Sequence, residues 1–187
     1  MAKIKVYVAH AMTGKIKAEL VKEAEYTTRQ LESYGFEVLD PIGAEEVKAT
    51  NEVQQQSAEQ LAIYWRRDKD MIKEADIVLD YMACNKSDGV AKEIGYARWC
   101  LWKPVVRVFP NCGVNISRIE DDAIVNDLPS AIDLMHEKYG SYEKLKAWRQ
   151  AIWDRSFQKW VAEQNRMNER YGVVVNGRGP TCILEVV

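Results

Sequence analysis

A glutamate near the middle of the chain stands among residues that suit a slim, buried helix. The stretch SDGVAKEIGYA, residues 87–97, places Glu93 among alanine and glycine residues shortly after a turn signal. Desolvating a carboxylate costs several kcal/mol unless another group pairs with it. A carboxylate held in a cleft in this way can act as a nucleophile or as a general base. The alternative is an ordinary solvated glutamate on a charged helix.

The beginning of the same stretch suits the binding of an anion. Ser87, Asp88 and Gly89 open the predicted helix, where they offer a hydroxyl and free backbone N–H groups. The helix dipole favours negative charge at this end. If Ser87 caps the helix, Glu93 lies about 9 Å further along its axis, at a rise of about 1.5 Å per residue. The alternative for Ser87 and Gly89 is a plain helix cap.

Three further side chains can support such chemistry. Tyr7 lies in the first predicted strand and faces away from Val6 and Val8, and its hydroxyl needs a partner if it is buried. Asp68 lies near the end of a predicted helix, in RRDKDMIKEAD, and His10 directly follows the first strand. For these residues the alternatives are a core tyrosine, a solvated aspartate and a structural histidine.

Strands alternate with helices as far as about residue 139. The predicted strands are 3–9, 36–39, 75–82 and 103–109, and the predicted helices are 15–34, 54–74, 89–101 and 128–139. Because parallel neighbours need crossover connections, the alternation predicts an α/β fold with a doubly wound, Rossmann-like or flavodoxin-like parallel sheet. Ligands bind such sheets at the carboxyl ends of the strands. The loops HAMTG, CNKSDG and NCGVNIS all fall at that edge.

The last quarter of the chain departs from this pattern. We expect an α/β domain over residues 1–139 and an extension over residues 140–187. The extension consists of a long charged helix at about 141–169 and a β-rich tail that can form a hairpin. The helix carries an aromatic stripe that includes Trp153 and Phe157. Such a stripe is more typical of a packing face or a homodimer face than of a ligand site.

Composition narrows the classes of function. A chain of 187 residues suits one domain, or one domain with an extension. The formal net charge of -2 provides no basic field, which argues against a nucleic acid polymer as a partner. The chain has no run of 18 apolar residues, which argues against a membrane span, and its first residues lack a signal-peptide pattern. The 4 cysteines lie far apart, as expected of reduced thiols in a cytoplasmic protein.

Four stretches in order carry a resemblance to a known family. They are YVAHAMTG (7–14), RDKDMIKEADIVL (67–79), SDGVAKEIGYA (87–97) and KPVV (103–106). Together they resemble the nucleoside 2-deoxyribosyltransferase superfamily, and within it the 2′-deoxynucleoside 5′-monophosphate N-hydrolases and related nucleotide glycosidases. The resemblance covers roughly residues 4–137. It implies that Glu93 is the nucleophile that attacks the anomeric carbon, that Tyr7 orients this carboxylate, and that Asp68 assists the departing base.

The resemblance also bears on the choice between a nucleoside and a nucleotide substrate. Ser87 occupies the position, six residues before Glu93, where transferases of this superfamily tend to have aspartate and phosphate-accepting hydrolases tend to have serine. A carboxylate there would repel a 5′ phosphate by about 4 kcal/mol at a separation of about 4 Å and an effective dielectric constant of about 20. Asp88 is adjacent, and a shift by one residue would reverse this argument.

Other phosphate contacts follow from the same resemblance. Ser117 resembles a serine that a neighbouring subunit lends to the phosphate in the hydrolases. The loop HAMTG lacks the glycine and the arginine that follow the first strand in those enzymes, and it has His10 and Thr13 in their places. Thr13, Gly14 and His10 are therefore the candidates for binding the phosphate in this loop.

The sequence thus predicts a cytoplasmic enzyme that hydrolyses the N-glycosidic bond of a (deoxy)nucleoside 5′-monophosphate through a glycosyl ester on Glu93. It needs no metal and no organic cofactor, its partner is a small nucleotide or nucleoside, and it forms a homodimer or a higher homo-oligomer. One alternative is a deoxyribosyltransferase that exchanges bases. Another is a nucleotide-binding sensor without catalysis, whose helix at 141–169 docks a partner.

Overall fold

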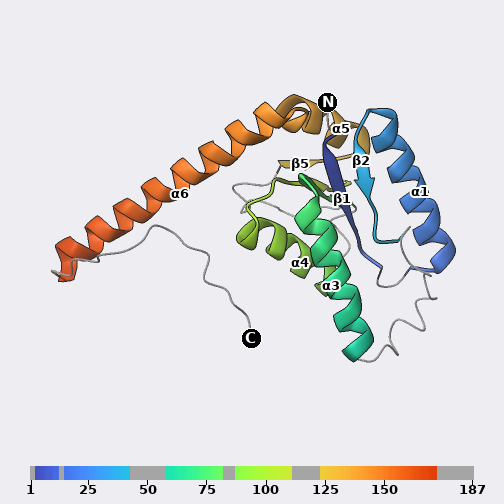
Figure 1. Ribbon diagram of the computed structural model, residues 1–187, viewed down its shortest axis with the longest axis horizontal. Coiled ribbons are helices and arrows are strands. Elements are labelled where there is room, and N and C mark those ends of the chain that lie inside the picture. Colours follow the sequence, from blue (N-terminus) through green and yellow to red (C-terminus); the bar gives the residue numbers. More distant parts are fainter. Residues whose placement is uncertain (1–2, 13–14, 43–57, 82–86, 111–122, 172–187) are drawn as a thin grey trace.

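Five parallel strands form a single sheet in the part of the chain that the computed structural model describes, which comprises residues 3–12, 15–42, 58–81, 87–110 and 123–171. Their order is β2-β1-β3-β4-β5. The bounds are Lys5–His10 for β1, Glu37–Leu39 for β2, Ile77–Tyr81 for β3, Val105–Val108 for β4 and Ala123–Val125 for β5. The predicted α/β fold with a doubly wound parallel sheet is confirmed, and the strand order reverses between β1 and β3 (Figure 1).

Helices cover both faces of this sheet (Figure 1). They are α1 (Lys17–Ser33), α3 (Ala58–Glu74), α4 (Asp88–Gly95), a π-helical turn η1 (Tyr96–Cys100), α5 (Leu128–Tyr139) and α6 (Tyr142–Tyr171). Local sequence explains several of their ends. Gly35 adopts φ +90° after α1, a conformation that glycine accepts without a steric penalty. Asp127 caps α5 by accepting a hydrogen bond from the backbone N–H of Ser130 at 2.8 Å.

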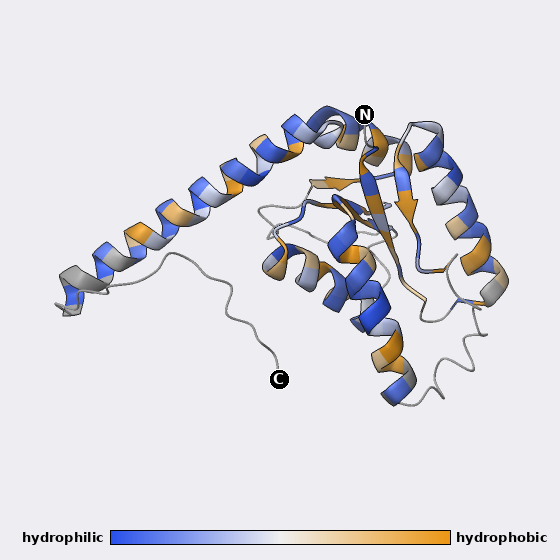
Figure 2. Cartoon of the chain, in the orientation of Figure 1, coloured by the Kyte–Doolittle hydropathy of each residue, from blue (hydrophilic) through white to orange (hydrophobic). Residues whose placement is uncertain are grey.

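Alternation along the strands divides the core into two layers. Val6 and Val8 of β1 point to the face covered by α1 and α5, whereas Tyr7 and Ala9 point to the face covered by α3 and α4. Apolar residues therefore run almost continuously along the central strands (Figure 2), as expected for a parallel sheet buried on both sides. The predicted orientation of Tyr7, opposite to its two valine neighbours, is confirmed.

Helix α6 begins on the domain and then extends away from it (Figure 1). Its first turns pack against α5, because Leu145 is buried and the ring of Trp148 meets Tyr139 edge-on at 5.8 Å. Further along, Trp153 and Phe157 are exposed. The predicted aromatic stripe is therefore partly a packing face within the chain. The division at residue 139 and the predicted homodimer stay predictions, and the tail lies outside the described residues.

Three details differ from the sequence-based expectation. The short strand β5 was not predicted, since Ala123–Val125 falls in a stretch without a clear period. The helix predicted at 89–101 consists of α4 and the π-helical turn η1, after which Trp102 has a positive φ of 52°. Strand β1 includes His10, which was expected to follow the first strand directly. The loop NCGVNIS lies outside the described residues.

Candidate active site

Glu93 lies in the second turn of α4, on the side that packs against the sheet. Val90 and Ile94 of the same helix are buried, and they seat α4 against β1 and β3. The Oε2 atom of Glu93 is buried and has no hydrogen-bond partner of ordinary geometry among the described residues. Glu93 is therefore not the solvated helix residue of the alternative interpretation. Buried polar atoms without a partner are rare in folded proteins, and each one calls for an explanation.

Tyr7, on β1, interacts with Glu93 from the sheet. Its side chain is fully buried, and its hydroxyl also lacks a hydrogen-bond partner of ordinary geometry among the described residues. Burial, together with the charge of Glu93, raises the pKa of Tyr7 well above its usual value, so the hydroxyl keeps its proton. A protonated phenol beside a carboxylate can donate to it and hold it in place.

Asp68 approaches the same place from α3. Its side chain is largely buried, and Oδ1 accepts hydrogen bonds from Nε of Arg67 at 3.1 Å and from Nη2 of Arg67 at 2.6 Å. Burial raises the pKa of Asp68, and the Arg67 guanidinium opposes this shift. The charge of Asp68 acts on both Tyr7 and Glu93. The structure thus brings together the three side chains predicted to be catalytic, from β1, α3 and α4.

Electrostatics in this cluster favour the protonated form of Glu93. Burial is the largest cause, the neighbouring Asp68 charge is the second, and together they raise the pKa of Glu93 to about 8. The Tyr7 hydroxyl opposes the shift, because it stabilises the ionised carboxylate. A carboxyl group whose pKa is raised this far by burial and a charged neighbour is a candidate for acid, base or nucleophilic chemistry.

Ser87 and Gly89 lie at the N-terminus of α4, the helix that carries Glu93. Ser87 adopts an extended backbone and accepts a hydrogen bond from the backbone N–H of Val90 at 3.4 Å, so it caps the helix as predicted. Gly89 is exposed, and a Cβ added there would meet only the Ser87 Oγ at 3.6 Å. Packing therefore does not require glycine at this position. Binding of a phosphate by Ser87 and Gly89 stays a prediction.

His10 lies on the other face of the sheet. Its ring points with Val6 and Val8 toward the α1 and α5 side, because side chains alternate along β1. The ring is buried, its Nε2 is 3.1 Å from Oδ2 of Asp40, and its centroid is 5.8 Å from that of Tyr81. His10 is thus separated from the Glu93 cluster by the sheet. Thr13, Gly14 and Ser117, the remaining predicted phosphate contacts, lie outside the described residues.

A family profile described as nucleoside 2-deoxyribosyltransferase matches residues 6–145 of this chain. The chain belongs to the nucleoside 2-deoxyribosyltransferase family. The family recognised from the four sequence stretches is therefore confirmed, and so is the predicted class of enzyme, an N-glycosidase or a deoxyribosyltransferase. Members of this family act on small nucleosides or nucleotides. A comparison with curated proteins found no match.

Two solved structures are similar to this chain. A 2-deoxyribosyltransferase from Bacillus psychrosaccharolyticus is 22% identical, with a TM-score of 0.50, and the match covers 75% of this chain and 95% of that one. A CMP N-glycosidase from Clostridium botulinum is 21% identical, with a TM-score of 0.45, and the match covers 71% of this chain and 98% of that one. At these identities the likeness concerns the fold.

A second buried charge pair borders the cluster and was missed by the sequence analysis. Asp80 of β3 and Arg107 of β4 are partners in the strand register, and Oδ2 of Asp80 lies 3.6 Å from Nε of Arg107. Both point to the same face as Tyr7, and the charge of Asp80 also raises the pKa of Glu93. A charged residue inside each of two strongly apolar strands was the signal that would have revealed the pair.

Two further observations concern metal sites and membrane spans. No group of three or more histidine, cysteine, aspartate or glutamate side chains could hold a metal ion in the described part of the chain. Among the helices that the structure describes, none combines the length and apolar character needed to cross a bilayer.

Proposed function

We propose that this enzyme hydrolyses the N-glycosidic bond of a (deoxy)nucleoside 5′-monophosphate and releases a free base and a sugar 5-phosphate. The observation that carries the proposal is the buried cluster of Glu93, Asp68 and Tyr7, in which the Oε2 atom of Glu93 and the hydroxyl of Tyr7 have no hydrogen-bond partner of ordinary geometry among the described residues. Both are buried at the point where the strand order reverses, which is the usual ligand position in a doubly wound sheet. A substrate would supply the contacts that these groups lack in the free protein.

In the first step, the ionised carboxylate of Glu93 attacks C1′ of the sugar. The bond from C1′ to the base nitrogen breaks, and its electron pair leaves with the base. The carboxyl group of Asp68, whose pKa is raised by burial, donates a proton to the departing base. The product is a glycosyl ester on Glu93. The Tyr7 hydroxyl would hold the carboxylate in line with C1′.

In the second step, water replaces the enzyme at C1′. Asp68, now ionised, accepts a proton from the water as its oxygen bonds to C1′. The ester bond breaks, and Glu93 leaves as a carboxylate. Retaining glycosidases use the same two-step mechanism, in which one carboxylate is the nucleophile and a second group acts first as an acid and then as a base.

The phosphate would lie at the N-terminus of α4. Ser87 and the backbone N–H groups near Gly89 are the candidates there, since a helix N-terminus attracts anions. Thr13, Gly14 and a Ser117 lent by a second subunit are the further predicted contacts. We do not include His10 in this set, because its ring lies across the sheet from Glu93 and pairs with Asp40.

Incubation with a panel of ribo- and deoxyribonucleosides and their 5′-monophosphates tests the proposal, with free base measured by chromatography. Base should be released from at least one monophosphate. The Glu93→Gln variant should lose at least about 10³-fold in rate, as expected when a nucleophile is removed. Glu32→Gln, an exposed position on α1, is the matched control and should keep the wild-type rate. Equal turnover by the wild-type and Glu93→Gln proteins would refute the proposal.

Transfer of the sugar to a second base is the other candidate, and the description of the matching family favours it. Hydrolysis and transfer share the glycosyl ester and differ in what attacks it. Adding a second free base to the assay separates them. Formation of a new nucleoside or nucleotide would favour transfer, whereas release of the sugar alone would favour hydrolysis.

A further inference from the structure

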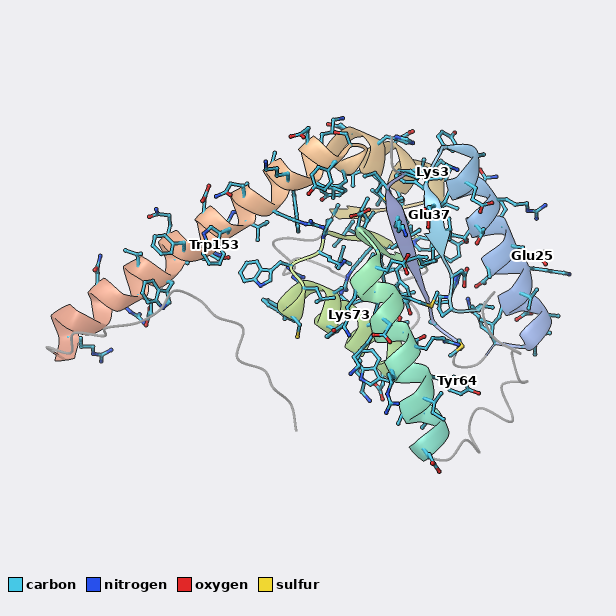
Figure 3. The ribbon with its side chains drawn as sticks, viewed as in Figure 1. Lys3, Glu25, Glu37, Tyr64, Lys73 and Trp153 are labelled. Atoms are coloured by element: carbon cyan, nitrogen blue, oxygen red, sulfur yellow. The ribbon has the colours of Figure 1, made fainter. Side chains whose placement is uncertain are left out.

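A groove lies at the edge of the sheet opposite to the carboxyl ends. Helix α6 meets the segment that leads into β4 and the end of α3 there, and the space between them has a volume of about 610 Å³. The lining residues are Lys73, Leu101, Trp102, Lys103, Tyr142, Lys146, Arg149, Gln150 and Trp153. Lys73 on α3 and Trp153 on α6 are labelled in Figure 3. The volume falls within the range typical of sites for small ligands, about 300–1,000 Å³.

Every charged side chain that lines the groove is basic. Two of these four basic side chains are paired with acidic residues that do not line the groove. Lys73 lies 3.0 Å from Asp70, and Arg149 lies 3.9 Å from Asp76. Lys146, on α6, has no hydrogen bond or ion pair with another described residue. The whole chain has a formal net charge of -2, so this concentration of positive charge is local. It suits an anion.

Lys103 is a buried residue in the lining of the groove. Its Nζ donates hydrogen bonds to the backbone carbonyl of Lys73 at 2.7 Å and to that of Ala75. It thereby satisfies carbonyl groups at the end of α3, which have no partner within the helix. Burial lowers the pKa of Lys103, and the nearby Arg149 charge lowers it further.

Aromatic rings form the other part of the lining. The rings of Trp102 and Trp153 are 6.4 Å apart between centroids and inclined by 57°, and Trp153 and Tyr142 are substantially exposed. Trp102 adopts a positive φ of 52°, which is unfavourable for a bulky residue. Strained backbone of this kind tends to occur where a side chain must be held for function. Exposed indole rings beside basic groups can stack on a planar aromatic ligand.

We propose that this groove is a second ligand site that binds a nucleoside phosphate, with the phosphate at Lys146 and Arg149 and the base against Trp102 and Trp153. A simple anion would need only the basic groups, and an uncharged aromatic only the rings. A nucleotide uses both. The inference does not rest on the proposed function, because the groove adjoins the amino ends of β3 and β4 and shares no residue with the Glu93 cluster.

Calorimetric titration with AMP tests the inference, with adenosine and inorganic phosphate as separate probes. A Glu93→Gln background prevents turnover, and the indole N–H resonances of Trp102 and Trp153 report binding in the groove. AMP should shift both resonances, and each of the other two probes should bind at least about tenfold more weakly. Lys146→Glu should weaken this binding at least about tenfold, and Trp153→Ala about fivefold.

Two variants provide matched controls. Lys22→Glu makes the same change of charge at an exposed position on α1, and Phe157→Ala removes an exposed ring one turn further along α6 than Trp153. Neither should alter binding in the groove. The inference would be overturned if AMP left the Trp102 and Trp153 resonances unchanged, which would restrict nucleotide binding to the Glu93 site. Equal weakening by Lys146→Glu and Lys22→Glu would also overturn it, because it would reveal only a general effect of net charge.

Discussion

Two clusters of buried polar side chains lie toward the same edge of the sheet, on opposite faces, and they are built differently. On the α1 side, His10 pairs with Asp40 at 3.1 Å, and the second oxygen of Asp40 accepts the backbone N–H of Ile42 at 2.8 Å. Both clusters contain buried polar atoms without a hydrogen-bond partner among the described residues: Nδ1 of His10 on the α1 side, and Oε2 of Glu93 and the hydroxyl of Tyr7 on the α3 side. Asp68 adds a second negative charge to the cluster on the α3 side.

The difference separates a structural cluster from a candidate catalytic one. In the His10 cluster, the buried carboxylate faces groups of opposite role, because each oxygen of Asp40 has a defined partner, Nε2 of His10 or the backbone N–H of Ile42. In the Glu93 cluster, groups of like charge are crowded together and a carboxyl group is held in its less usual protonation state. Folding gains nothing from the second arrangement, so a role in binding or chemistry explains it better. Three predictions test this contrast.

A loss of stability is expected in the His10 cluster. His10→Ala removes the partner of a buried carboxylate and leaves a cavity beside Tyr81, so it should lower the free energy of unfolding by about 3 kcal/mol. Thermal unfolding followed by circular dichroism measures the loss. His136→Ala, at an exposed histidine on α5, should cost less than about 1 kcal/mol.

The same variant also tests the predicted contact between His10 and the phosphate. If His10 is structural, His10→Ala should leave KM for a monophosphate unchanged at a temperature where the variant remains folded. A raised KM with an unaltered melting temperature would instead assign His10 to the substrate. It would then remove the distinction between the two clusters.

The residues of the Glu93 cluster could be predicted from the sequence because short, local patterns determine where they lie. The alternation in KIKVYVA fixes the face of Tyr7, and the spacing from Ser87 fixes the turn that holds Glu93. The pair formed by Asp80 and Arg107 was missed because it depends on the register between β3 and β4, which local periodicity does not contain. The partner of His10 was missed for a similar reason, since Asp40 lies 30 residues away, directly after β2.

Outside the site, too, local sequence patterns failed to predict features that depend on tertiary packing. Strand β5 has only three residues, which are too few to establish a period of two, and its place is set by pairing with β4. The aromatic positions of α6 look alike in sequence, yet Trp148 packs on Tyr139 while Trp153 reaches the groove. Which aromatic ring meets the domain depends on where α6 leaves it, and this is a property of tertiary packing.

An effect of opposite sign on stability is expected in the Glu93 cluster. The folded protein holds the Glu93 proton more tightly than the unfolded chain does, since the pKa rises from 4.5 to about 8 on folding. The resulting destabilisation is absent below about pH 4.5, grows as the pH rises and is complete above about pH 8. Glu93→Gln should therefore be more stable than the wild type by about 4 kcal/mol at pH 8, and equally stable at pH 4.

Thermal unfolding of both proteins between pH 4 and pH 8.5 measures this difference. Glu32→Gln on α1 is the control, and its difference from the wild type should not change with pH across this range. A Glu93→Gln protein that is less stable than the wild type at pH 8 would indicate that Glu93 contributes to folding. The contrast with the His10 cluster would then fail.

The smallest effect expected is a shift in the pH dependence of the reaction. If Glu93 attacks as a carboxylate, the rise of kcat/KM with pH should have its midpoint near pH 8, where the free enzyme loses the proton of this group. The charge of Asp68 helps to raise that pKa, so Asp68→Asn should move the midpoint of the rise to lower pH, whatever it does to the maximal rate. Asp70→Asn removes the same charge two residues further along α3, at an exposed position, and should leave the midpoint in place. A midpoint that stays fixed or moves upward in Asp68→Asn would mean that the two carboxyl groups are not coupled, and Asp68 would lose its place beside the nucleophile.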